Sequence, residues 1–358
     1  MPAGTRTIAV TGLNATDNPA PGVAVLRCLR DACPHDRLVG LAYDALDPGA
    51  YATGLIDDVF MLPYPSSDPD AFFERLCQIH AELPLSVIIP TLDAELPVFI
   101  ELAPRLRQLG VAALLPTREQ FDSRSKANLT KLARRAGFHT PDTILVSSIK
   151  ELQAALPTLR FPLYVKSPLY GAELVTNSED AAEAFQHFAA EWGHPIILQA
   201  CVPGATREER NVVALGDGRG GLAGAVAMKK LAVTEKGKGW AGVTIRDDTL
   251  MQLTERFVRC TEWRGPFELE VMLSGDGTYY VIEINPRFPA WVYLSASAGV
   301  NLPERVLTLA TGGELAPAPD YKTGTMFVRI SLDQIAHVTD LERLVVMGQW
   351  RRGHGASE

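Results

Sequence analysis

The chain has 358 residues, which is long enough for two or three compact units. Hydrophobic residues make up 47% of it and charged residues 21%, a composition that excludes an intrinsically disordered protein. Its 34 Lys and Arg against 42 Asp and Glu give a formal net charge of −8. A long-range basic field is therefore absent, and no nucleic-acid partner is expected.

The sequence also carries no signal for a membrane or for secretion. No stretch reaches the roughly 18 apolar residues of a membrane helix, and residues 1–6 lack the basic start and apolar run of a signal peptide. The cysteines are odd in number and widely spread, which favours small core residues in a reduced protein. We therefore expect a cytoplasmic protein with no membrane partner. The five cysteines are Cys28, Cys33, Cys77, Cys201 and Cys260.

The first third of the chain alternates short apolar runs with helical patterns, which predicts a parallel sheet covered by helices on both faces. Ligands bind such sheets beyond the carboxyl ends of the strands, where we expect the loops 12–22 and 91–95 to lie. In the second loop, Asp93 and Glu95 could bind a substrate ammonium group, or they could cap the following helix. The expected strands are residues 8–12, 38–43, 57–62 and 85–90, and the expected helices are 22–29, 70–81 and 96–109.

The pattern changes in the middle of the chain. A helix with a basic face is expected at 123–137, ended by Gly137 and then Pro141. Farther on, two glycine-rich turns at 217–221 and 274–278 separate apolar runs and predict antiparallel hairpins. The expected strands are 143–146, 161–166, 196–202, 211–216, 222–230, 267–273, 279–284 and 326–330, and the expected helices are 148–156, 178–192 and 250–263.

The most informative segment is the hairpin that joins residues 268–270 to residues 283–287. Glu270 and Glu283 lie on its two adjacent strands, and Asn285 points to the same face as Glu283 because side chains alternate along a strand. Two carboxylates and an amide oxygen are hard ligands that suit Mg²⁺, with Mn²⁺ as the alternative ion. A cross-strand pair of solvated acids is the other interpretation.

Two lysines on separate segments form the second feature. Lys126 opens the basic helix, and Lys166 ends the apolar strand 161–166. A lysine at the end of a buried strand is costly unless an anion meets it, and nucleotide phosphates would supply that anion. Either lysine could instead extend its ammonium group to water.

The remaining candidates concern the nucleotide base and the substrate. The stretch 199–204 leaves a strand and could present backbone groups to adenine, or it could be a plain exit into a loop. Arg246 is a candidate clamp for a substrate carboxylate, because guanidinium and carboxylate form two parallel hydrogen bonds. The aromatic stretch 288–295 could line a substrate pocket, or it could be a core helix with Trp291 packed inward.

In their order and spacing these elements resemble the ATP-grasp superfamily, in its carbamoyl-phosphate-synthase-like, biotin-carboxylase-like branch. The resemblance covers residues 5–330, and Glu-Ile-Asn-Pro-Arg at 283–287 is its specific part. It implies a mixed α/β and α+β protein: a Rossmann-like parallel α/β N-terminal domain, then a two-subdomain ATP-grasp fold with antiparallel sheets. The implied segments are the N-terminal domain at 1–116, the small lid subdomain with its linking helix at 117–204, the large subdomain with the metal site at 205–330, and a C-terminal tail at 331–358.

The resemblance also implies roles for individual residues. Arg287 would face the reacting phosphoryl group, with Lys166 and Arg246 as further catalytic residues. Glu208 or Glu209 would bind the ribose. The implied ligands of two Mg²⁺ ions are Glu270, Glu283 and Asn285, and the implied ATP-binding residues are Lys126, Lys166, Gln199, Ala200, Cys201, Val202, Glu208 and Glu209.

The sequence departs from the family pattern at two places. Relatives often carry a glycine-rich lid after the strand lysine, whereas the stretch 167–172 here has one glycine. The glycine-rich, basic stretch 234–242 is the alternative lid, or else an exposed hairpin loop. Ser125 stands where relatives often have an acid before the first lysine.

The implied function is an ATP-dependent carboxylate–amine ligase. Mg-ATP would convert a substrate carboxylate to an acyl phosphate, and the amine of an amino acid or peptide would displace phosphate to give an amide. Two alternatives stay open: phosphorylation of bicarbonate or carbamate, and a nucleotide-binding module without ligase activity. The expected partners are a small-molecule or peptide carboxylate and amine, and the resemblance allows a homodimer.

Overall fold

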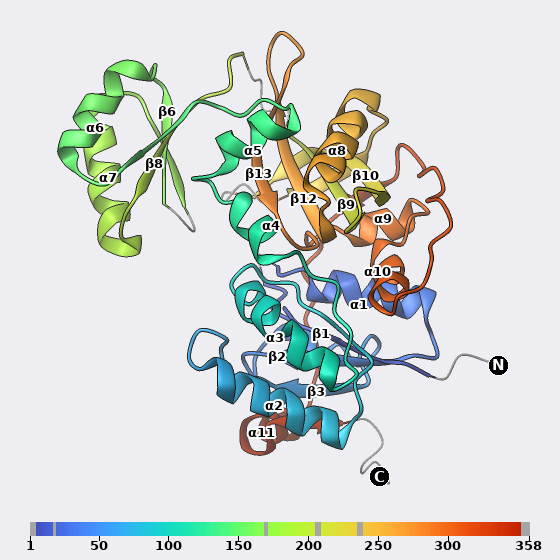
Figure 1. Ribbon diagram of the computed structural model, residues 1–358. Coiled ribbons are helices and arrows are strands. Elements are labelled where there is room, and N and C mark those ends of the chain that lie inside the picture. Colours follow the sequence, from blue (N-terminus) through green and yellow to red (C-terminus); the bar gives the residue numbers. More distant parts are fainter. Residues whose placement is uncertain (1–4, 17–18, 168–170, 205–208, 235–238, 352–358) are drawn as a thin grey trace. The chain divides into compact units, whose positions relative to one another are not determined.

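The computed structural model describes residues 5–16, 19–167, 171–204, 209–234 and 239–351 (Figure 1). The chain divides into two compact units. The first consists of Met1–Arg118, Val212–Glu268 and Asn285–Glu358, and the second of Glu119–Asn211 and Leu269–Ile284. This grouping differs from the four predicted segments, and three long strands contribute residues to both units: β9 (Glu209–Asp217), β12 (Arg264–Leu273) and β13 (Tyr279–Asn285). None of the described helices is both long and apolar enough to cross a membrane.

The predicted parallel sheet is present in the first unit, with the strand order β15-β3-β2-β1-β4. Strands β1 to β4 all pair in parallel and are almost completely buried, as expected of a sheet covered on both faces. Figure 1 shows α1 on one side of this sheet and α2 and α3 on the other. The elements are β1 (Thr7–Val10), α1 (Gly22–Ala32), β2 (Arg37–Ala42), η1 (Pro48–Tyr51), β3 (Asp58–Met61), α2 (Pro69–Glu82), β4 (Val87–Ile89) and α3 (Leu96–Gln108).

The predicted hairpins belong to a second sheet of six strands, in the order β13-β12-β9-β10-β11-β14. Strand β11 was not predicted, because the stretch 234–242 was expected to be a loop. A Cβ added at Gly242 would lie 2.6 Å from Met228 Sδ, so the glycine permits close packing inside the sheet. Residues 235–238 of the candidate lid lie outside the described part of the chain. The elements are β9 (Glu209–Asp217), β10 (Leu222–Val233), β11 (Gly239–Thr244), α8 (Asp248–Thr261), β12 (Arg264–Leu273), β13 (Tyr279–Asn285), α9 (Tyr293–Ser297), α10 (Leu302–Ala310) and β14 (Met326–Val328).

The C-terminal segment carries two elements that the sequence did not predict, α11 (Val338–Met347) and β15 (Gln349–Arg351). Strand β15 pairs antiparallel with β3 and extends the first sheet. The carboxylate of Asp58 on β3 is fully buried, and it pairs with Arg37 at 2.5 Å and with Arg351 at 3.4 Å. A buried carboxylate needs such cations, which fixes β15 to this edge.

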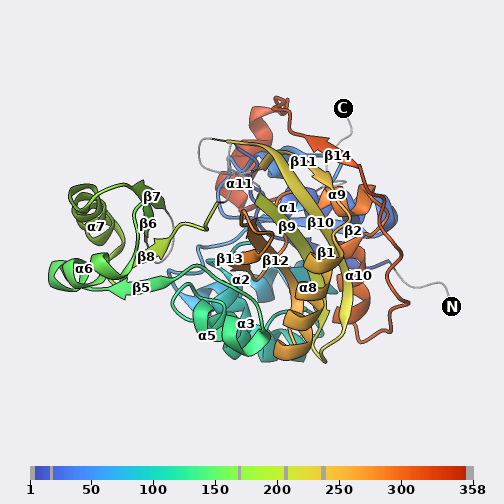
Figure 2. The ribbon, with the colours of Figure 1, turned by 90° about the horizontal axis from the view of Figure 1, so that it is seen from above.

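The second unit contains a four-stranded antiparallel sheet in the order β5-β8-β6-β7. Figure 2 shows α6 and α7 side by side over one face of it, and their apolar residues pack on buried residues such as Leu163 and Val165 of β6. Strand β7 follows the short lid stretch and was missed. The elements are β5 (Thr143–Val146), α6 (Ile149–Ala155), η2 (Leu156–Thr158), β6 (Leu163–Lys166), β7 (Ala172–Val175), α7 (Ser178–Trp192) and β8 (Ile196–Ala200).

The basic helix expected at 123–137 is two helices, α4 (Arg118–Ser123) and α5 (Leu129–Ala136), so the single-helix prediction is wrong. The turn between them is closed by Asn128, whose side chain donates to the Asp122 carbonyl at 3.0 Å. Asparagine side chains compete with the helical backbone in this way. Lys126 therefore lies in a turn, while Gly137 ends α5 in the left-handed conformation, as predicted.

Candidate functional site

Lys166 stands at the end of β6 in the second unit, where the sequence placed it. Its Nζ donates to Gln199 Oε1 at 2.6 Å, and Gln199 Nε2 donates to Thr143 Oγ1 at 3.3 Å. These three residues come from neighbouring strands of one sheet. The hydrogen bonds therefore fix the direction of the lysine side chain before any ligand is present.

The charged groups around Lys166 shift its pKa in opposite directions. The pKa of Lys166 falls to about 8, mainly because the group is buried and secondly because Lys126 repels it. The carboxylates of Glu283 and Glu270 act in the opposite direction. Lys126 Nζ also lies 4.0 Å from Glu283 Oε1. Two lysines and two glutamates of the second unit thus share one electrostatic environment.

This group of four, which we call the lysine–glutamate cluster (Lys126, Lys166, Glu270 and Glu283), suits a magnesium-bound polyphosphate. Neighbouring ammonium groups repel each other unless a polyanion lies between them. Mg²⁺ usually takes one or two protein carboxylates and completes its shell with phosphate oxygens and water. The described residues include no cluster of three or more His, Cys, Asp or Glu side chains that could hold a metal ion.

Other predicted nucleotide-binding residues lie near the lysine–glutamate cluster. Burial raises the pKa of the Cys201 thiol and nearby Lys166 lowers it, which places Cys201 beside the lysine. Burial raises the pKa of Tyr164, and so do Cys201 and Glu209. Ala200 pairs with Leu163 across β8 and β6, and Val202 is buried. Glu208 lies outside the described residues. The contact of these residues with ATP stays a prediction.

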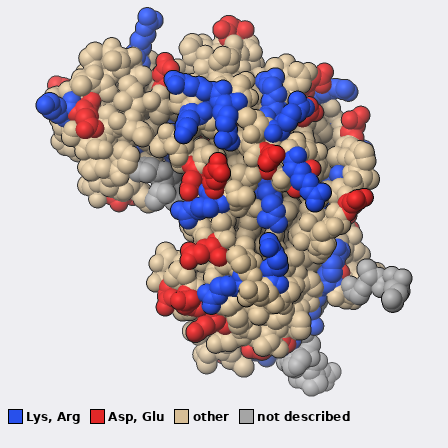
Figure 3. Space-filling view, viewed as in Figure 1, with Lys and Arg blue, Asp and Glu red and all other residues tan. Residues whose placement is uncertain are grey.

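The exposed face of α5 is basic, as the sequence suggested. Lys131, Arg134 and Arg135 are exposed on it, while Leu132 and Ala133 are buried. Figure 3 shows Lys and Arg side chains gathered over α5 in the upper part of the view. This local positive charge stands on a chain whose net charge is negative, so it would attract small anions rather than create a long-range field.

Arg287 of the first unit is held between two carboxylates. Its Nε donates to Asp93 Oδ2 at 2.7 Å, and its Nη1 lies 3.9 Å from Glu268 Oε2. Glu268 is buried, and it also accepts from Trp291 Nε1 at 2.7 Å and from Asn285 Nδ2 at 3.0 Å. These five residues form an arginine cluster whose hydrogen bonds fix the guanidinium group in place.

The arginine cluster bears on the predicted roles of Trp291 and Asn285. Trp291 is buried and hydrogen-bonded to Glu268, so the core interpretation of this tryptophan is confirmed. Because Asn285 Nδ2 donates to Glu268, Oδ1 is the side-chain atom of Asn285 that could ligate a metal. Asn285 belongs to the first unit and Glu270 and Glu283 to the second, and a metal site shared by all three stays a prediction.

Asp93 and Glu268 are the residues of the arginine cluster to which the sequence gave no role at Arg287. Glu268 precedes Glu270 by two positions, so strand alternation could have placed both on one face. The sequence gives no signal that Asp93 contacts Arg287, because the two residues are 194 positions apart.

Glu95 occupies the N-cap position of α3, but its side chain makes no capping hydrogen bond there. Its side chain is completely buried, so it does not bind a substrate ammonium group. Oε1 accepts from Thr11 Oγ1 at 2.5 Å and from the backbone amides of Thr91 and Leu92 at 2.7 and 2.8 Å. Oε2 accepts from the Tyr43 hydroxyl. Burial raises the pKa of Glu95, which these hydrogen bonds oppose. Glu95 thus joins the carboxyl ends of β1, β2 and β4 and holds the turn that carries Asp93.

Arg246 follows β11 on the surface of the first unit. Its side chain is 79% exposed, and its Nε lies 3.6 Å from Asp248 Oδ1. An exposed ion pair of this kind contributes little to stability. Its role as a carboxylate clamp stays a prediction.

A comparison with protein-family models matches one segment in the second half of the chain. Residues 195–331 match the family described as ATP-grasp in the biosynthetic pathway with Ter operon. The matched segment contains both predicted magnesium-binding glutamates and Arg287.

A comparison with curated proteins finds the large chain of carbamoyl phosphate synthase from Thermoanaerobacter sp. (strain X514). The two sequences are 25% identical over 241 residues, which is 63% of this chain and 22% of the relative. This chain therefore spans about a fifth of the relative's length.

Solved structures share the fold at low sequence identity. The biotin carboxylase domain dimer of 2-oxoglutarate carboxylase from Hydrogenobacter thermophilus, which contains MgADP, ADP and bicarbonate, matches with a TM-score of 0.67 and 15% identity over 89% of this chain and 71% of that one. An L-amino acid ligase from Bacillus licheniformis matches with a TM-score of 0.63 and 19% identity over 86% of this chain and 74% of that one.

Together these findings confirm the resemblance to the ATP-grasp superfamily and to carbamoyl phosphate synthase. The biotin carboxylase structure shares the fold. These findings also confirm the fold class, a mixed α/β chain with parallel and antiparallel sheets.

Proposed function

We propose that this protein is an ATP-dependent ligase that joins a carboxylate to an amine. The carboxylate oxygen attacks the γ-phosphorus of ATP, the bond to ADP breaks, and an acyl phosphate forms. The amine nitrogen then attacks the acyl carbon, phosphate leaves with the bonding electron pair, and the nitrogen gives up a proton as the amide forms. The products are the amide, ADP and phosphate.

The lysine–glutamate cluster is the observation that carries this proposal. Lys126 and Lys166 bind the phosphates of ATP as point charges. Glu270 and Glu283, with Asn285 Oδ1, hold Mg²⁺, which when bound neutralises charge on the transferring phosphoryl group. The lowered pKa of Lys166 supports this role, since a lysine repelled by a second lysine gains most from a polyanion.

The end of β8 holds the adenosine part of ATP. The backbone groups of Ala200 and Val202 contact adenine, Gln199 and Cys201 also belong to the ATP-binding site, and Glu208 or Glu209 binds the ribose. The hydrogen bond from Lys166 Nζ to Gln199 Oε1 supports this arrangement, because it links the base-binding strand to the lysine that binds phosphate.

Arg287 binds the phosphoryl group or the acyl phosphate. Its contacts with Asp93 and Glu268 hold the guanidinium group before the substrate arrives, so little reorganisation is needed during the reaction. Lys166 assists it, and Arg246 clamps the carboxylate of the acceptor or donor. Amino acids and small peptides are the proposed substrates, which the likeness to an L-amino acid ligase supports.

The test measures phosphate release from MgATP in the presence of pools of carboxylic acids, amines and amino acids. The proposal expects release only when both a carboxylate and an amine are supplied, with a new amide detected by mass spectrometry. Phosphate release should be lost in Glu283→Gln, whereas Glu255→Gln, a matched substitution at an exposed position of α8, should leave it unchanged. Tight ATP binding without phosphate release in any pool would show a nucleotide-binding module instead.

A second candidate is phosphorylation of bicarbonate. The carboxylase structure that shares this fold contains bicarbonate beside its nucleotides, which favours testing it. Phosphate release with bicarbonate as the sole added carboxylate, and without an amine, would favour this reaction over amide formation.

A further inference from the structure

A pocket of about 310 Å³ lies in the first unit, where the C-terminal segment meets the connection between β2 and β3. The connection supplies Tyr51 at the end of η1, while α11 supplies Leu344 and β15 supplies Trp350. Its volume is at the lower end of the roughly 300–1,000 Å³ range of small-molecule pockets. The pocket shares no residue with the lysine–glutamate cluster or the arginine cluster, so it is a separate candidate site.

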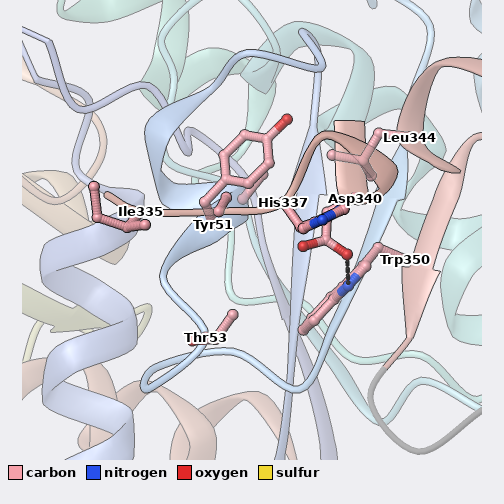
Figure 4. Close-up of a pocket in the computed structure, with 9 residues that line it drawn as sticks. Tyr51, Thr53, Ile335, His337, Asp340, Leu344 and Trp350 are labelled. Atoms are coloured by element: carbon pink, nitrogen blue, oxygen red, sulfur yellow. Dashed lines mark hydrogen bonds between the residues drawn. The ribbon is translucent and has the colours of Figure 1, made fainter. Parts of the chain in front are cut away.

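The walls of this pocket are largely apolar and aromatic. Leu344 is buried, Tyr51 and Trp350 are half-buried, and Ile335 is 92% exposed at one side of the pocket (Figure 4). The two rings belong to residue types whose faces attract cations as well as apolar groups. A ligand with an apolar body would cover Ile335 and remove its side chain from water.

Asp340 brings a negative charge to these walls. Among the described residues that line the pocket, Asp340 is the one acid and none is Lys or Arg. Its Oδ1 accepts from Trp350 Nε1 at 3.1 Å. Figure 4 shows the other carboxylate oxygen turned away from Trp350, toward the side on which Ile335 and Thr53 lie. Trp350 thus orients the carboxylate so that Oδ2 faces a ligand in the pocket.

The charge of Asp340 is felt inside the pocket. Burial raises the pKa of the Tyr51 hydroxyl, and the carboxylates of Asp340 and Asp44 raise it further. Arg343 opposes this charge, because its Nη1 lies 3.7 Å from Asp340 Oδ1, but its side chain is 44% exposed and the pair is screened by water. A partly buried carboxylate beside two aromatic rings suits an ammonium group, which gains from both.

We propose that this pocket binds a small organic ammonium compound, in which a primary amine is joined to a flat apolar body. The ammonium group donates to Asp340 Oδ2, and the apolar body packs against Tyr51, Leu344 and Trp350. A carboxylic acid of the same shape is rejected, because its charge would meet that of Asp340. This inference goes beyond the proposed function and does not depend on it.

The test is calorimetry on the full chain at pH 7 with three compounds of similar shape and different charge. They are 2-phenylethylamine, which is a cation, the neutral 2-phenylethanol and the anion 3-phenylpropionate. We expect the amine to bind at least about 10-fold more tightly than the alcohol, because hydrogen bonds to charged groups are the stronger ones. No binding of the anion is expected.

Asp340→Asn removes the charge but keeps a side-chain oxygen that can accept from Trp350 Nε1. It should weaken binding of the amine about 10- to 100-fold and change the affinity for the alcohol less than about two-fold. Asp333→Asn is the matched control, since Asp333 is exposed in the same C-terminal segment and does not line the pocket. This control should leave both affinities unchanged.

Two further variants separate a binding role of Asp340 from a structural one. Arg343→Gln should tighten binding of the amine about two- to five-fold, because it removes a competing cation. Thr53→Trp, at an exposed position of the pocket wall, should fill the pocket and abolish binding of amine and alcohol alike. Thermal unfolding of each variant checks that the fold is retained.

Three results would overturn the proposal. The first is no binding of the amine by the wild type at millimolar concentration. The second is equal affinity of the wild type for the amine and for 3-phenylpropionate. The third is an affinity for the amine in Asp340→Asn that matches the affinity in Asp333→Asn.

Discussion

The two clusters of charged residues differ in their electrostatics. In the arginine cluster, Arg287 is paired with Asp93 and with Glu268, and Glu268 also accepts hydrogen bonds from two further side chains. In the lysine–glutamate cluster, Lys126 lowers the pKa of Lys166, and the two glutamates only partly offset burial and repulsion. The hydrogen bonds of the arginine cluster already fix the orientation of Arg287. In the lysine–glutamate cluster, a bound polyanion would offset the repulsion between the two lysines.

This difference assigns separate tasks to the two clusters. Groups that are fixed before the reaction stabilise a transition state without reorganising, which fits Arg287. Groups that repel each other in the free protein gain when a polyanion binds, which fits Lys126 and Lys166. The comparison therefore predicts that changes in the arginine cluster reduce turnover, while changes at the two lysines reduce ATP affinity.

Glu283→Gln should have the largest effect, because it removes a metal-binding charge that also lies beside both lysines. We expect kcat to fall about 1,000-fold, at the upper end for the loss of one electrostatic group. Phosphate release under saturating MgATP measures it, with Glu255→Gln as the control. If Glu283→Gln turned over near the wild-type rate at low Mg²⁺, the assignment of Glu283 as a metal ligand would be wrong.

Arg287→Lys should reduce kcat about 100-fold while ATP affinity changes less than about two-fold. Lysine keeps the positive charge but cannot reproduce the planar guanidinium between Asp93 and Glu268. Steady-state kinetics and calorimetry separate the two effects, with the exposed Arg256→Lys as the control. Equal losses of turnover and of ATP affinity in Arg287→Lys would contradict the proposal that the arginine cluster acts in turnover and the two lysines in ATP binding.

Glu95→Gln should lower the free energy of unfolding by about 2 kcal/mol, because an amide nitrogen would replace an oxygen that accepts a hydrogen bond in a buried site. Urea unfolding measures the change, and Glu101→Gln on the exposed face of α3 is the control. A value indistinguishable from that control would show that Glu95 does not hold the turn before Asp93.

The smallest effect concerns protons at Lys166. Its pKa of about 8 means that the free protein loses the Lys166 proton as the pH rises through that value. Phosphates favour the ammonium form and raise the pKa again, so ATP binding at pH 8 should take up about half a proton. Calorimetry in buffers with different protonation enthalpies measures this uptake. It should vanish in Lys166→Ala, and an unchanged uptake there would assign the proton to another group.

The sequence predicted the parallel sheet well because its strands are fully buried and read as apolar runs. It missed β11, where glycines hide the strand pattern and packing against Met228 decides the structure. It also missed β15, whose partner β3 is distant in the sequence and whose arginine pairs with a buried aspartate. Both elements depend on tertiary contacts rather than on local pattern.

Candidate site residues were predictable where local geometry determines them. The hairpin pattern placed Glu270 and Glu283 on adjacent strands, and both carboxylates raise the pKa of Lys166. The helix expected to carry Lys126 was wrong, because Asn128 closes a turn there. Local geometry could not show that Asp93 reaches Arg287 or that Glu95 is buried, since these facts arise when distant segments fold together.

The most direct test of the central claim compares nucleotide binding in three proteins by calorimetry: the wild type, Lys166→Ala and Glu283→Gln. The account predicts that the wild type binds MgATP more tightly than metal-free ATP, that Lys166→Ala weakens both, and that Glu283→Gln abolishes the advantage of Mg²⁺. Equal affinity for MgATP in all three proteins would contradict it.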